Sequence, residues 1–438
     1  MASALEELLG KIDSRNAVVG VIGLGYVGLP VLLLFCESDF RVIGFDVDTA
    51  KVDALTRGES YIRHIGVDRV RSAFTSGRAE ATTDFDRLAL CDAIVICVPT
   101  PLGDHREPDL KYVRMTAEAI APRLHSGQVV VLESTTYPFT TREILLPGFG
   151  ATGLRCGEDF FLAFSPERED PGNERFVTKT IPKVVGGIDE PSLRAATALY
   201  GAAIDRIVPV SSAEVAESAK LLENIFRAVN IALVNELKVV FDRMGLDVWE
   251  VIDAAKTKPF GFMPFYPGPG LGGHCIPLDP FYLTWKAAEY GTWARFIELA
   301  GEINSSMPRY VVQKVVDAVN GQGKSIVGAD VVVLGLAYKP NIDDDRESPS
   351  FELLELLAER GANVAYCDPH IPRMRRRRKG TLDLESVPCT AEALRGFDAI
   401  VVATAHDEFK DETLYAGAKL VIDTRNIVPR GGGSVVRA

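Results

Sequence analysis

Basic side chains are scarce in this sequence. Its 48 Lys and Arg residues are outnumbered by 60 Asp and Glu residues, which leaves a formal net charge of -12. Because proteins bind nucleic acid through basic surfaces, this balance argues against nucleic acid as a partner. An anionic ligand must instead meet a local group of cations. One dense basic run, residues 375–379, is interpreted as a solvated loop rather than as a site for nucleic acid or an anionic membrane.

Cysteine is sparse as well. The seven cysteines are scattered along the chain, with neither the close spacing of a disulfide scaffold nor a Cys-x-x-Cys pair. We therefore expect a reducing, cytoplasmic environment. No further Cys or His stands at metal-ligand spacing from His274 and Cys275, so we expect no metal site there.

A membrane-spanning segment is also lacking. Residues 17–35 carry no charge and are long enough on hydropathy alone to cross a bilayer. Glycines at positions 20, 23, 25 and 28 interrupt this run, however, and predict a buried strand, a tight turn and a helix instead. Residues 1–16 contain acidic side chains and no apolar core, which argues against a secretory signal.

What the sequence does contain is the pattern of a large folded protein. A chain of 438 residues exceeds what one hydrophobic core usually organises. Its 47% hydrophobic and 25% charged residues are ordinary for a globular protein. Apolar strand patterns alternate with helical patterns in the first half, which predicts a parallel sheet covered on both faces. The candidate strands there are residues 18–22, 42–45, 93–98 and 129–132.

A long helical pattern follows at residues 212–244, without Pro or Gly, and ends at Gly245. Beyond Pro308 the alternation of strands and helices returns. Its segments are residues 331–334, 350–359, 364–366, 399–402 and 420–422. We expect an α/β protein of two Rossmann-like doubly wound domains, joined by a long central helix and a helical middle domain. The expected boundaries are residues 1–211, 212–322 and 323–438.

The two α/β halves share a short pattern, because residues 92–96 (DAIVI) reappear almost unchanged as residues 398–402 (DAIVV). Duplication of one unit explains this similarity. A buried parallel strand after an acidic turn would produce the same letters without common origin, so both interpretations stay open.

A G-x-G-x-x-G pattern formed by Gly23, Gly25 and Gly28 follows the first candidate strand and opens a helix, and Asp46 ends the next strand. Such glycines let the backbone approach a pyrophosphate at a helix N-terminus, while the carboxylate binds ribose hydroxyls. A carboxylate repels a 2'-phosphate, so the pattern favours NAD over NADP. The alternative is a simple packing turn. Ligands of open α/β sheets bind at the carboxyl ends of strands, and the candidates there are residues 98–101 and 134–136.

A second group of glycines lies in residues 268–279, where Cys275 is followed four residues later by Asp279. A thiol and a carboxylate could share one pocket there. Alone, a cysteine is more often a small buried hydrophobe. The neighbouring His274 could also suggest a Cys-His hydrolase or a metal ligand, although adjacent side chains seldom point the same way.

Lys220 and Asn224 are spaced i to i+4 on the long helix and therefore share a face. A cation and an amide there could stabilise an oxyanion, or they could belong to a solvated helix face. Glu167 lies in a charged loop and is equally ambiguous.

These patterns together resemble one family, the UDP-glucose and UDP-N-acetylhexosamine 6-dehydrogenases, nearly from end to end. The segments that carry the resemblance are residues 23–28, 97–101, 133–136, 165–167, 220–224, 268–279, 337–339 and 344–349. Within the family the chain looks most like bacterial UDP-N-acetylglucosamine 6-dehydrogenases of surface-polysaccharide pathways, through residues 256–262 and 272–275.

The resemblance implies a role for each matching residue. Cys275 would be the nucleophile, Lys220 and Asn224 would hold the oxyanion, and Thr135, Glu167 and Asp279 would position or activate water. The residues expected to bind NAD are Gly23, Gly25, Tyr26, Val27, Gly28, Asp46, Pro99, Thr100, Ser134, Thr135 and Arg346. The residues expected to bind the UDP-sugar are Glu167, Lys220, Asn224, Tyr266, Gly268, Gly270, Gly272 and Lys339.

The implied reaction is a four-electron oxidation of the sugar C6 hydroxyl to a carboxylate. An aldehyde cannot lose a second hydride until a nucleophile adds to it, and a thiolate would supply that addition as a thiohemiacetal and then a thioester. UDP-N-acetylglucosamine is the expected substrate, with UDP-N-acetylmannosamine, UDP-N-acetylgalactosamine or UDP-glucose as alternatives. A sensor that binds both ligands without turnover is a more distant alternative.

The family's long helix forms a dimer core, so a homodimer or higher homo-oligomer is expected. One departure concerns Lys258 and Pro259, where UDP-glucose enzymes place an arginine that reaches the sugar in a neighbouring subunit. This departure puts cross-subunit sugar contacts in doubt.

Overall fold

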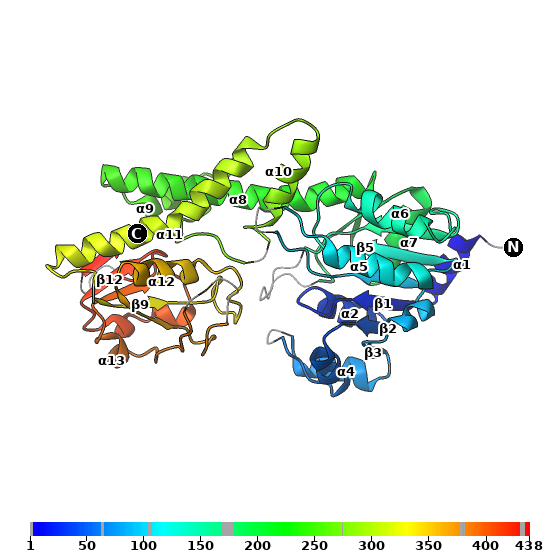
Figure 1. Ribbon diagram of the computed structural model, residues 1–438, viewed down its shortest axis with the longest axis horizontal. Coiled ribbons are helices and arrows are strands. Elements are labelled where there is room, and N and C mark those ends of the chain that lie inside the picture. Colours follow the sequence, from blue (N-terminus) through cyan, green and yellow to red (C-terminus); the bar gives the residue numbers. More distant parts are fainter. Residues whose placement is uncertain are drawn as a thin grey trace. The chain divides into compact units, whose positions relative to one another are not determined.

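The computed structural model describes residues 3–62, 65–103, 107–168, 178–273, 275–375, 380, 382–429 and 434–438 (Figure 1). The chain divides into two compact units. The first comprises residues 1–223 and 281–292, and the second comprises residues 224–280 and 293–438. Each unit is built around its own parallel or largely parallel sheet.

The sheet of the first unit has the strand order β3-β2-β1-β4-β5-β6-β7-β8. Its strands are mostly short apolar runs buried on both faces, as expected for a sheet covered by helices. All neighbours pair in parallel except β6 and β7, which are antiparallel. The strands are β1 Val18–Ile22, β2 Arg41–Phe45, β3 Ala79–Thr82, β4 Ala93–Ile96, β5 Gln128–Leu132, β6 Phe160–Phe164, β7 Lys183–Gly187 and β8 Ile207–Val210.

Helices connect these strands. Helix α2 is apolar all round and is buried from Gly28 to Cys36, because it lies against the centre of the sheet. The helices of this unit are α1 Ala4–Asp13, α2 Gly28–Glu37, α3 Thr49–Thr56, α4 Val67–Thr75, α5 Lys111–Ile120, α6 Leu146–Gly150 and α7 Glu190–Gly201. A helical turn, η3 Thr141–Leu145, leads directly into α6.

The sheet of the second unit has the strand order β10-β9-β11-β12-β13 and is parallel throughout. Its strands are β9 Asp330–Leu334, β10 Asn363–Cys367, β11 Ala399–Val402, β12 Leu420–Asp423 and β13 Ser434–Arg437. Its helices include α9 Val248–Ala255, α11 Arg295–Gly321, α12 Pro349–Glu359 and α13 Ala391–Leu394. Pro308 lies inside helix α11 and does not end it.

Two helices belong to both units. The long helix α8, Ala213–Met244, is one uninterrupted helix (Figure 1). Helix α10, Asp279–Glu289, follows the cysteine loop. The α/β class with two Rossmann-like sheets and a helical central region is confirmed. The domain boundaries at residues 211 and 322 stay predictions.

The two sheets repeat the same local structure after their first strands. Gly23 and Gly335 have left-handed φ angles of 90° and 93°. The next residue in each case donates its backbone N–H to a carboxylate at the end of the neighbouring strand, Asp46 at 2.9 Å and Asp368 at 2.6 Å. These matched contacts favour duplication of one unit as the explanation of the repeated sequence pattern.

Cys367 and Cys389 form a disulfide that the scattered cysteines did not predict. Their Cα atoms lie 5.6 Å apart although 22 residues separate them in the sequence. Among the described residues, no helix is both long enough and apolar enough to cross a bilayer.

Candidate active site

The glycine turn of the first unit has little room for side chains, except at its middle position. A Cβ atom on Gly28 would overlap the carbonyl oxygen of Gly23, and one on Gly23 would collide with the carbonyl of Cys97. A Cβ on Gly25 would meet no atom within 4 Å. The turn therefore packs tightly on the sheet and leaves open space at Gly25, beside the start of α2. This geometry fits the pyrophosphate of a dinucleotide.

Asp46 is fixed at the end of β2. One carboxylate oxygen accepts the backbone N–H of Leu24 at 2.9 Å and the ammonium of Lys51 at 3.1 Å, and the other accepts the backbone N–H of Asp48 at 2.9 Å. Lys51 was not among the predicted residues. Tyr26 and Val27 are half-buried in the glycine turn.

The carboxyl ends of β4 and β5 bring three predicted residues together. The hydroxyl of Thr100 donates to the carbonyl of Thr135 at 2.7 Å, and the hydroxyl of Ser134 donates to the carbonyl of Val98 at 2.7 Å. The buried Tyr282 of α10 donates its hydroxyl to the carbonyl of Thr100. Pro99 is exposed at the same strand end.

Lys220 on α8 is paired with Glu167. Its ammonium donates to the backbone carbonyl of Glu167 at 2.5 Å and lies 3.3 Å from a carboxylate oxygen of the same residue. The two side chains are 5% and 15% exposed, so this is a largely buried ion pair. Glu167 therefore does not belong to a fully solvated loop.

One helical turn further along α8, Asn224 is paired with Asp279. The amide nitrogen of Asn224 donates to a carboxylate oxygen of Asp279 at 2.5 Å, and its amide oxygen accepts from Arg227. Both Asn224 and Asp279 are buried. The backbone N–H of Asp279 donates to the carbonyl of Cys275 at 2.8 Å, which makes Cys275 the first residue of the turn that opens α10. The second unit thus places Cys275, Asp279 and Asn224 in one connected group.

The glycines of residues 268–273 are required by packing against the protein itself. A Cβ on Gly268 would collide with the guanidinium of Arg425, and one on Gly272 would lie 2.6 Å from the side chain of Tyr338. Gly270 has a φ of 138° and faces the ring atoms of two prolines. The backbone N–H of Gly268 donates to the side chain of Asn235 at 3.0 Å. The loop is thereby fixed within the second unit.

Lys339 and Arg346 lie in the long loop that follows β9. Lys339 is half-buried. The guanidinium of Arg346 forms a two-pronged ion pair with Asp344, at 2.9 and 2.6 Å, and its carbonyl accepts the N–H of Gly273 at 3.1 Å.

A pocket of about 360 Å³ in the second unit lies next to the loop of residues 268–273. It is lined by Trp249, Asp253, Lys256, Tyr266, Pro267, Ala405, Arg425 and Asn426. Burial lowers the pKa of Arg425 to about 10, which still leaves the guanidinium protonated at neutral pH. The rings of Trp249 and Tyr266 stack with their centroids 5.6 Å apart. The pocket combines an aromatic wall with a half-buried cation, a combination that suits a nucleotide.

The comparisons with known proteins agree on one family. The UDP-glucose/GDP-mannose dehydrogenase family matches through three domains, its NAD binding domain at residues 17–204, its central domain at 214–306 and its UDP binding domain at 332–430. The chain belongs to this family.

Individual relatives cover nearly the whole chain. A UDP-N-acetyl-D-glucosamine 6-dehydrogenase from Pseudomonas aeruginosa is 35% identical over 399 residues, which cover 91% of this chain and 92% of the relative. The solved UDP-N-acetyl-D-mannosamine dehydrogenase from Pyrococcus horikoshii superposes with a TM-score of 0.87 at 33% identity, covering 95% of this chain and 98% of that one. The chain is therefore an NAD-dependent UDP-sugar dehydrogenase, and the expected family and cofactor are confirmed.

The family assignment gives each unit its ligand. The tight glycine turn and Asp46 lie in the NAD binding domain, and Lys339 and Arg425 lie in the UDP binding domain. The sequence patterns missed Trp249, Arg425 and Asn426. For Arg425 a signal was available, because it stands two residues after β12, at the carboxyl end of a parallel strand.

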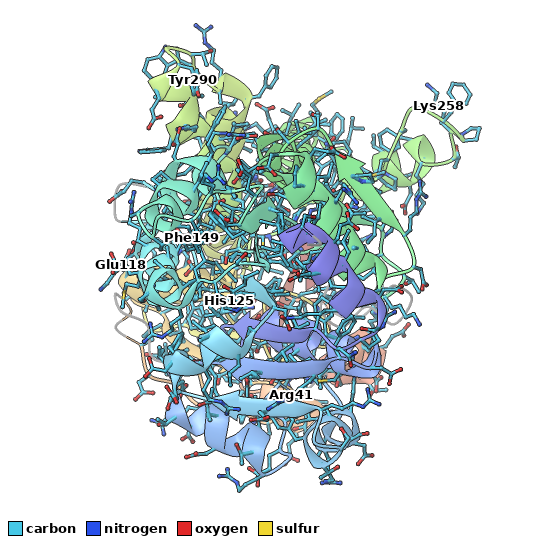
Figure 2. The ribbon with its side chains drawn as sticks, turned by 90° about the vertical axis from the view of Figure 1, so that its right-hand side faces the viewer. Arg41, Glu118, His125, Phe149, Lys258 and Tyr290 are labelled. Carbon is cyan, nitrogen blue, oxygen red and sulfur yellow. A yellow bond between two sulfur atoms is a disulfide. The ribbon has the colours of Figure 1, made fainter. Side chains whose placement is uncertain are left out.

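Two features of the sequence fall outside the described residues, namely His274 and residues 376–379 of the basic run. Within the described part, Lys258 lies on a projecting loop (Figure 2), with its ammonium 5.0 Å from the ring centroid of Phe260. That phenylalanine is 71% exposed.

Proposed function

We propose that this dehydrogenase oxidises the C6 hydroxyl of UDP-N-acetylglucosamine to the UDP-uronic acid, with Cys275 as a covalent nucleophile, as a precursor for surface polysaccharide. The observation that carries the proposal is the bond from Asn224 to the buried Asp279, whose backbone N–H closes a turn on the backbone carbonyl of the half-buried Cys275. A thiol, a carboxylate and an amide are the three groups that the second oxidation needs.

The chemistry assigns a step to each group. After the first oxidation, the Cys275 thiolate adds to C6 of the aldehyde and forms a thiohemiacetal, whose oxygen carries the negative charge. Loss of a second hydride from C6 gives a thioester, and water then releases the carboxylate and the thiol. Bound NAD supplies the hydride acceptor in each oxidation.

We assign Lys220 and Asn224 to stabilising the negative oxygen, and their position on one face of α8 supports this assignment. An amide nitrogen carries two N–H groups, and Asp279 accepts one of them from Asn224. Asp279 therefore fixes the direction in which the amide points. Glu167 acts in the same way on Lys220, and we assign Glu167, Asp279 and Thr135 to positioning the hydrolytic water.

The nucleotide end of the substrate is assigned to the second unit. Lys339, Tyr266 and the loop of Gly268, Gly270 and Gly272 hold the UDP-sugar, and the cation of Arg425 adds a charge for its pyrophosphate or uracil. Arg346, assigned to the dinucleotide, must share its guanidinium with Asp344.

The second candidate is the same oxidation of UDP-N-acetylmannosamine, which the superposition on the Pyrococcus horikoshii enzyme favours. UDP-N-acetylgalactosamine and UDP-glucose are further alternatives. The test is NADH release with the four UDP-sugars at equal concentrations. We expect the highest kcat/KM with UDP-N-acetylglucosamine. A higher value with another sugar would replace that substrate assignment, and no NADH with any of them would support a non-catalytic sensor.

We also propose a homodimer built on α8. The exposed apolar residues Phe226, Leu233, Val240 and Met244 recur at intervals of seven, seven and four and so form one stripe along this helix. A second copy of the helix would cover it. We further propose that the domain boundaries lie at residues 211 and 322. The proposed location is the cytoplasm.

A further inference from the structure

The loop that follows β9 lies at the switch point of the second sheet. Strand β9 stands between β10 and β11: the chain goes from β9 to β10 on one side, and from β10 it crosses to β11 on the other side of β9. Ligands of open α/β sheets bind at such a point. Residues 335–341, the first part of the long loop after β9 and called the loop below, lie here, and residues 403–407 follow β11.

Asp368 fixes the beginning of this loop. One carboxylate oxygen accepts the backbone N–H groups of Leu336 at 2.6 Å and Ala337 at 2.9 Å. The other accepts those of His370 at 2.8 Å and Ile371 at 3.0 Å. The side chain is fully buried.

Asp46, the equivalent carboxylate of the first sheet, has different hydrogen-bond partners. Asp46 accepts two backbone N–H groups and the half-buried ammonium of Lys51. Asp368 accepts four backbone N–H groups and a histidine instead. Since its lone pairs are directed at the protein, Asp368 is not a ribose ligand. Its role is to shape the loop.

His406 connects Asp368 to the far end of the loop. Its ring is fully buried, with Nε2 3.2 Å from Asp368 and Nδ1 2.9 Å from the backbone nitrogen of Asn341. The N–H of Asn341 can only donate, so Nδ1 is the acceptor and Nε2 carries the proton that binds Asp368. The side chains of His370 and Glu408 lie near enough to suggest a metal site with His406, but both ring nitrogens of His406 are engaged.

Asn341 adds further bonds at the same point. It has a left-handed φ of 63°. Its side chain exchanges two hydrogen bonds with Asp407, at 2.8 and 3.0 Å. The hydroxyl of Thr404 also donates to the carbonyl of Ala337 at 2.6 Å. The loop is thus held along both edges, and Lys339 stands between the two fixed ends.

We infer that His406 is a positioning residue for the nucleotide-sugar: by joining Asp368 to Asn341 it fixes the loop that presents Lys339. This inference rests on the proposed function, in which Lys339 holds the UDP-sugar. A loop that is already ordered loses no conformational freedom when the ligand binds. The hydrogen bonds that join Asp368, His406 and Asn341 therefore strengthen UDP-sugar affinity. His406 itself is not a catalytic residue.

Two substitutions each remove one of the two hydrogen bonds of the His406 ring and keep the other. The amide oxygen of His406→Asn can replace Nδ1 as the acceptor for Asn341, whereas the amide nitrogen of His406→Gln can replace Nε2 as the donor to Asp368. In His406→Gln we expect the KM for the UDP-sugar and the Kd for UDP alone to rise about tenfold, the equivalent of about 1.4 kcal/mol. We expect a smaller rise in His406→Asn, and kcat and NAD affinity close to those of the parent in both.

The control is His125→Gln, because His125 lies in the first unit (Figure 2) and its ring nitrogens lie at hydrogen-bond distance from the backbone carbonyls of Ser126 and Cys91. It should leave the KM and the Kd unchanged. UDP binding to the parent, measured by calorimetry, tests the proposed function separately. If the parent binds no UDP, the nucleotide assignment itself fails.

If the parent binds UDP and His406→Gln binds it equally well, the positioning role is wrong. The same conclusion follows if kcat and NAD affinity fall as much as UDP affinity, because that is the signature of general damage. Should His406→Gln not fold, His406→Asn decides, because it removes the bond to Asp368 and keeps the one to Asn341. A severalfold rise in its KM for the UDP-sugar supports the inference, and an unchanged KM overturns it.

Discussion

The amide of Asn224 donates a buried hydrogen bond of 2.5 Å to the carboxylate of Asp279, across 55 residues of sequence. This bond joins the long helix α8 to the turn that begins at Cys275. It explains why an amide is needed at position 224, since a carboxylate there would oppose a second buried carboxylate.

Asn224→Ala tests this relationship. Removing one donor to a developing oxyanion typically lowers turnover about 10²-fold to 10³-fold, and we expect a fall in kcat of that order with little change in KM. Asn230→Ala is the control, because that side chain donates to a backbone carbonyl of the same helix. Steady-state NADH release measures both. A change confined to KM would make Asn224 a binding residue.

Cofactor choice follows from Asp46. Its carboxylate would repel a 2'-phosphate, so we expect kcat/KM to be much higher with NAD than with NADP. In Asp46→Asn the ammonium of Lys51, 3.1 Å away in the parent, loses its ionic partner and can attract the phosphate. The preference for NAD should therefore narrow by about tenfold or more. Equal efficiency with both cofactors in the parent would contradict this assignment.

The stability of the protein should depend on pH through Glu217. Burial raises the pKa of this residue to about 7, although hydrogen bonds from Thr141 and Phe139 act in the opposite direction. In the unfolded chain the carboxyl ionises near its ordinary value of 4.5. Between these pH values the folded state keeps a proton that the unfolded state has lost, so the stability contribution of Glu217 falls as the pH rises across this window.

Glu217→Gln removes the titration, and its amide oxygen replaces one of the two oxygens that accept backbone N–H groups from Phe139 and Thr141. We expect the Tm of the variant, relative to that of the parent, to rise by a few degrees between pH 4.5 and a pH above 7. Glu236→Gln, an exposed change on the same helix, should show no such trend. A Tm difference between Glu217→Gln and the parent that does not vary with pH would refute the assignment.

The apolar stripe on α8 predicts the assembly. Leu233→Asp places a charge in the centre of the stripe and should convert the dimer to monomers, as measured by light scattering coupled to size exclusion. Val327→Asp introduces the same charge at an exposed loop position and should leave the mass unchanged. A parent protein that is monomeric at micromolar concentration would contradict the proposed dimer.

Local patterns predicted the parts of the fold that short segments determine. The glycine turn of Gly23 and Gly28, the apolar strands and the uninterrupted helix α8 all follow from spacing and composition. Strand β6, an unbroken apolar run, was missed because such a run does not distinguish a strand from a buried helix. Strands β3, β7, β8 and β13 were missed as well. Only the tertiary fold shows where these segments pair.

The site residues likewise divide into those that a local pattern predicts and those that only the tertiary fold reveals. Lys220 and Asn224 were recognisable because helical spacing alone puts them on one face. Contacts between residues far apart in the sequence could not be predicted. They include the contact of Tyr282 with Thr100, that of His406 with Asp368, and the disulfide of Cys367 and Cys389. Such pairs depend on which strand ends lie side by side, and no local pattern encodes that.

The most direct test of the account is the product formed by Cys275→Ala. The substitution replaces one small side chain by another, so the protein should fold and bind both ligands. The first oxidation needs no thiol, but without the thiohemiacetal the aldehyde has no route onward. Cys156→Ala is the control, because that half-buried thiol lies beside Ser192 in the first unit.

The measurement is mass spectrometry of the quenched reaction, with a hydrazide present to trap aldehyde. The account predicts that UDP-uronate falls by orders of magnitude in Cys275→Ala while trapped aldehyde is detected, and that Cys156→Ala matches the parent. Formation of UDP-uronate by Cys275→Ala at nearly the parent rate would contradict the covalent mechanism and leave Cys275 as a packing residue.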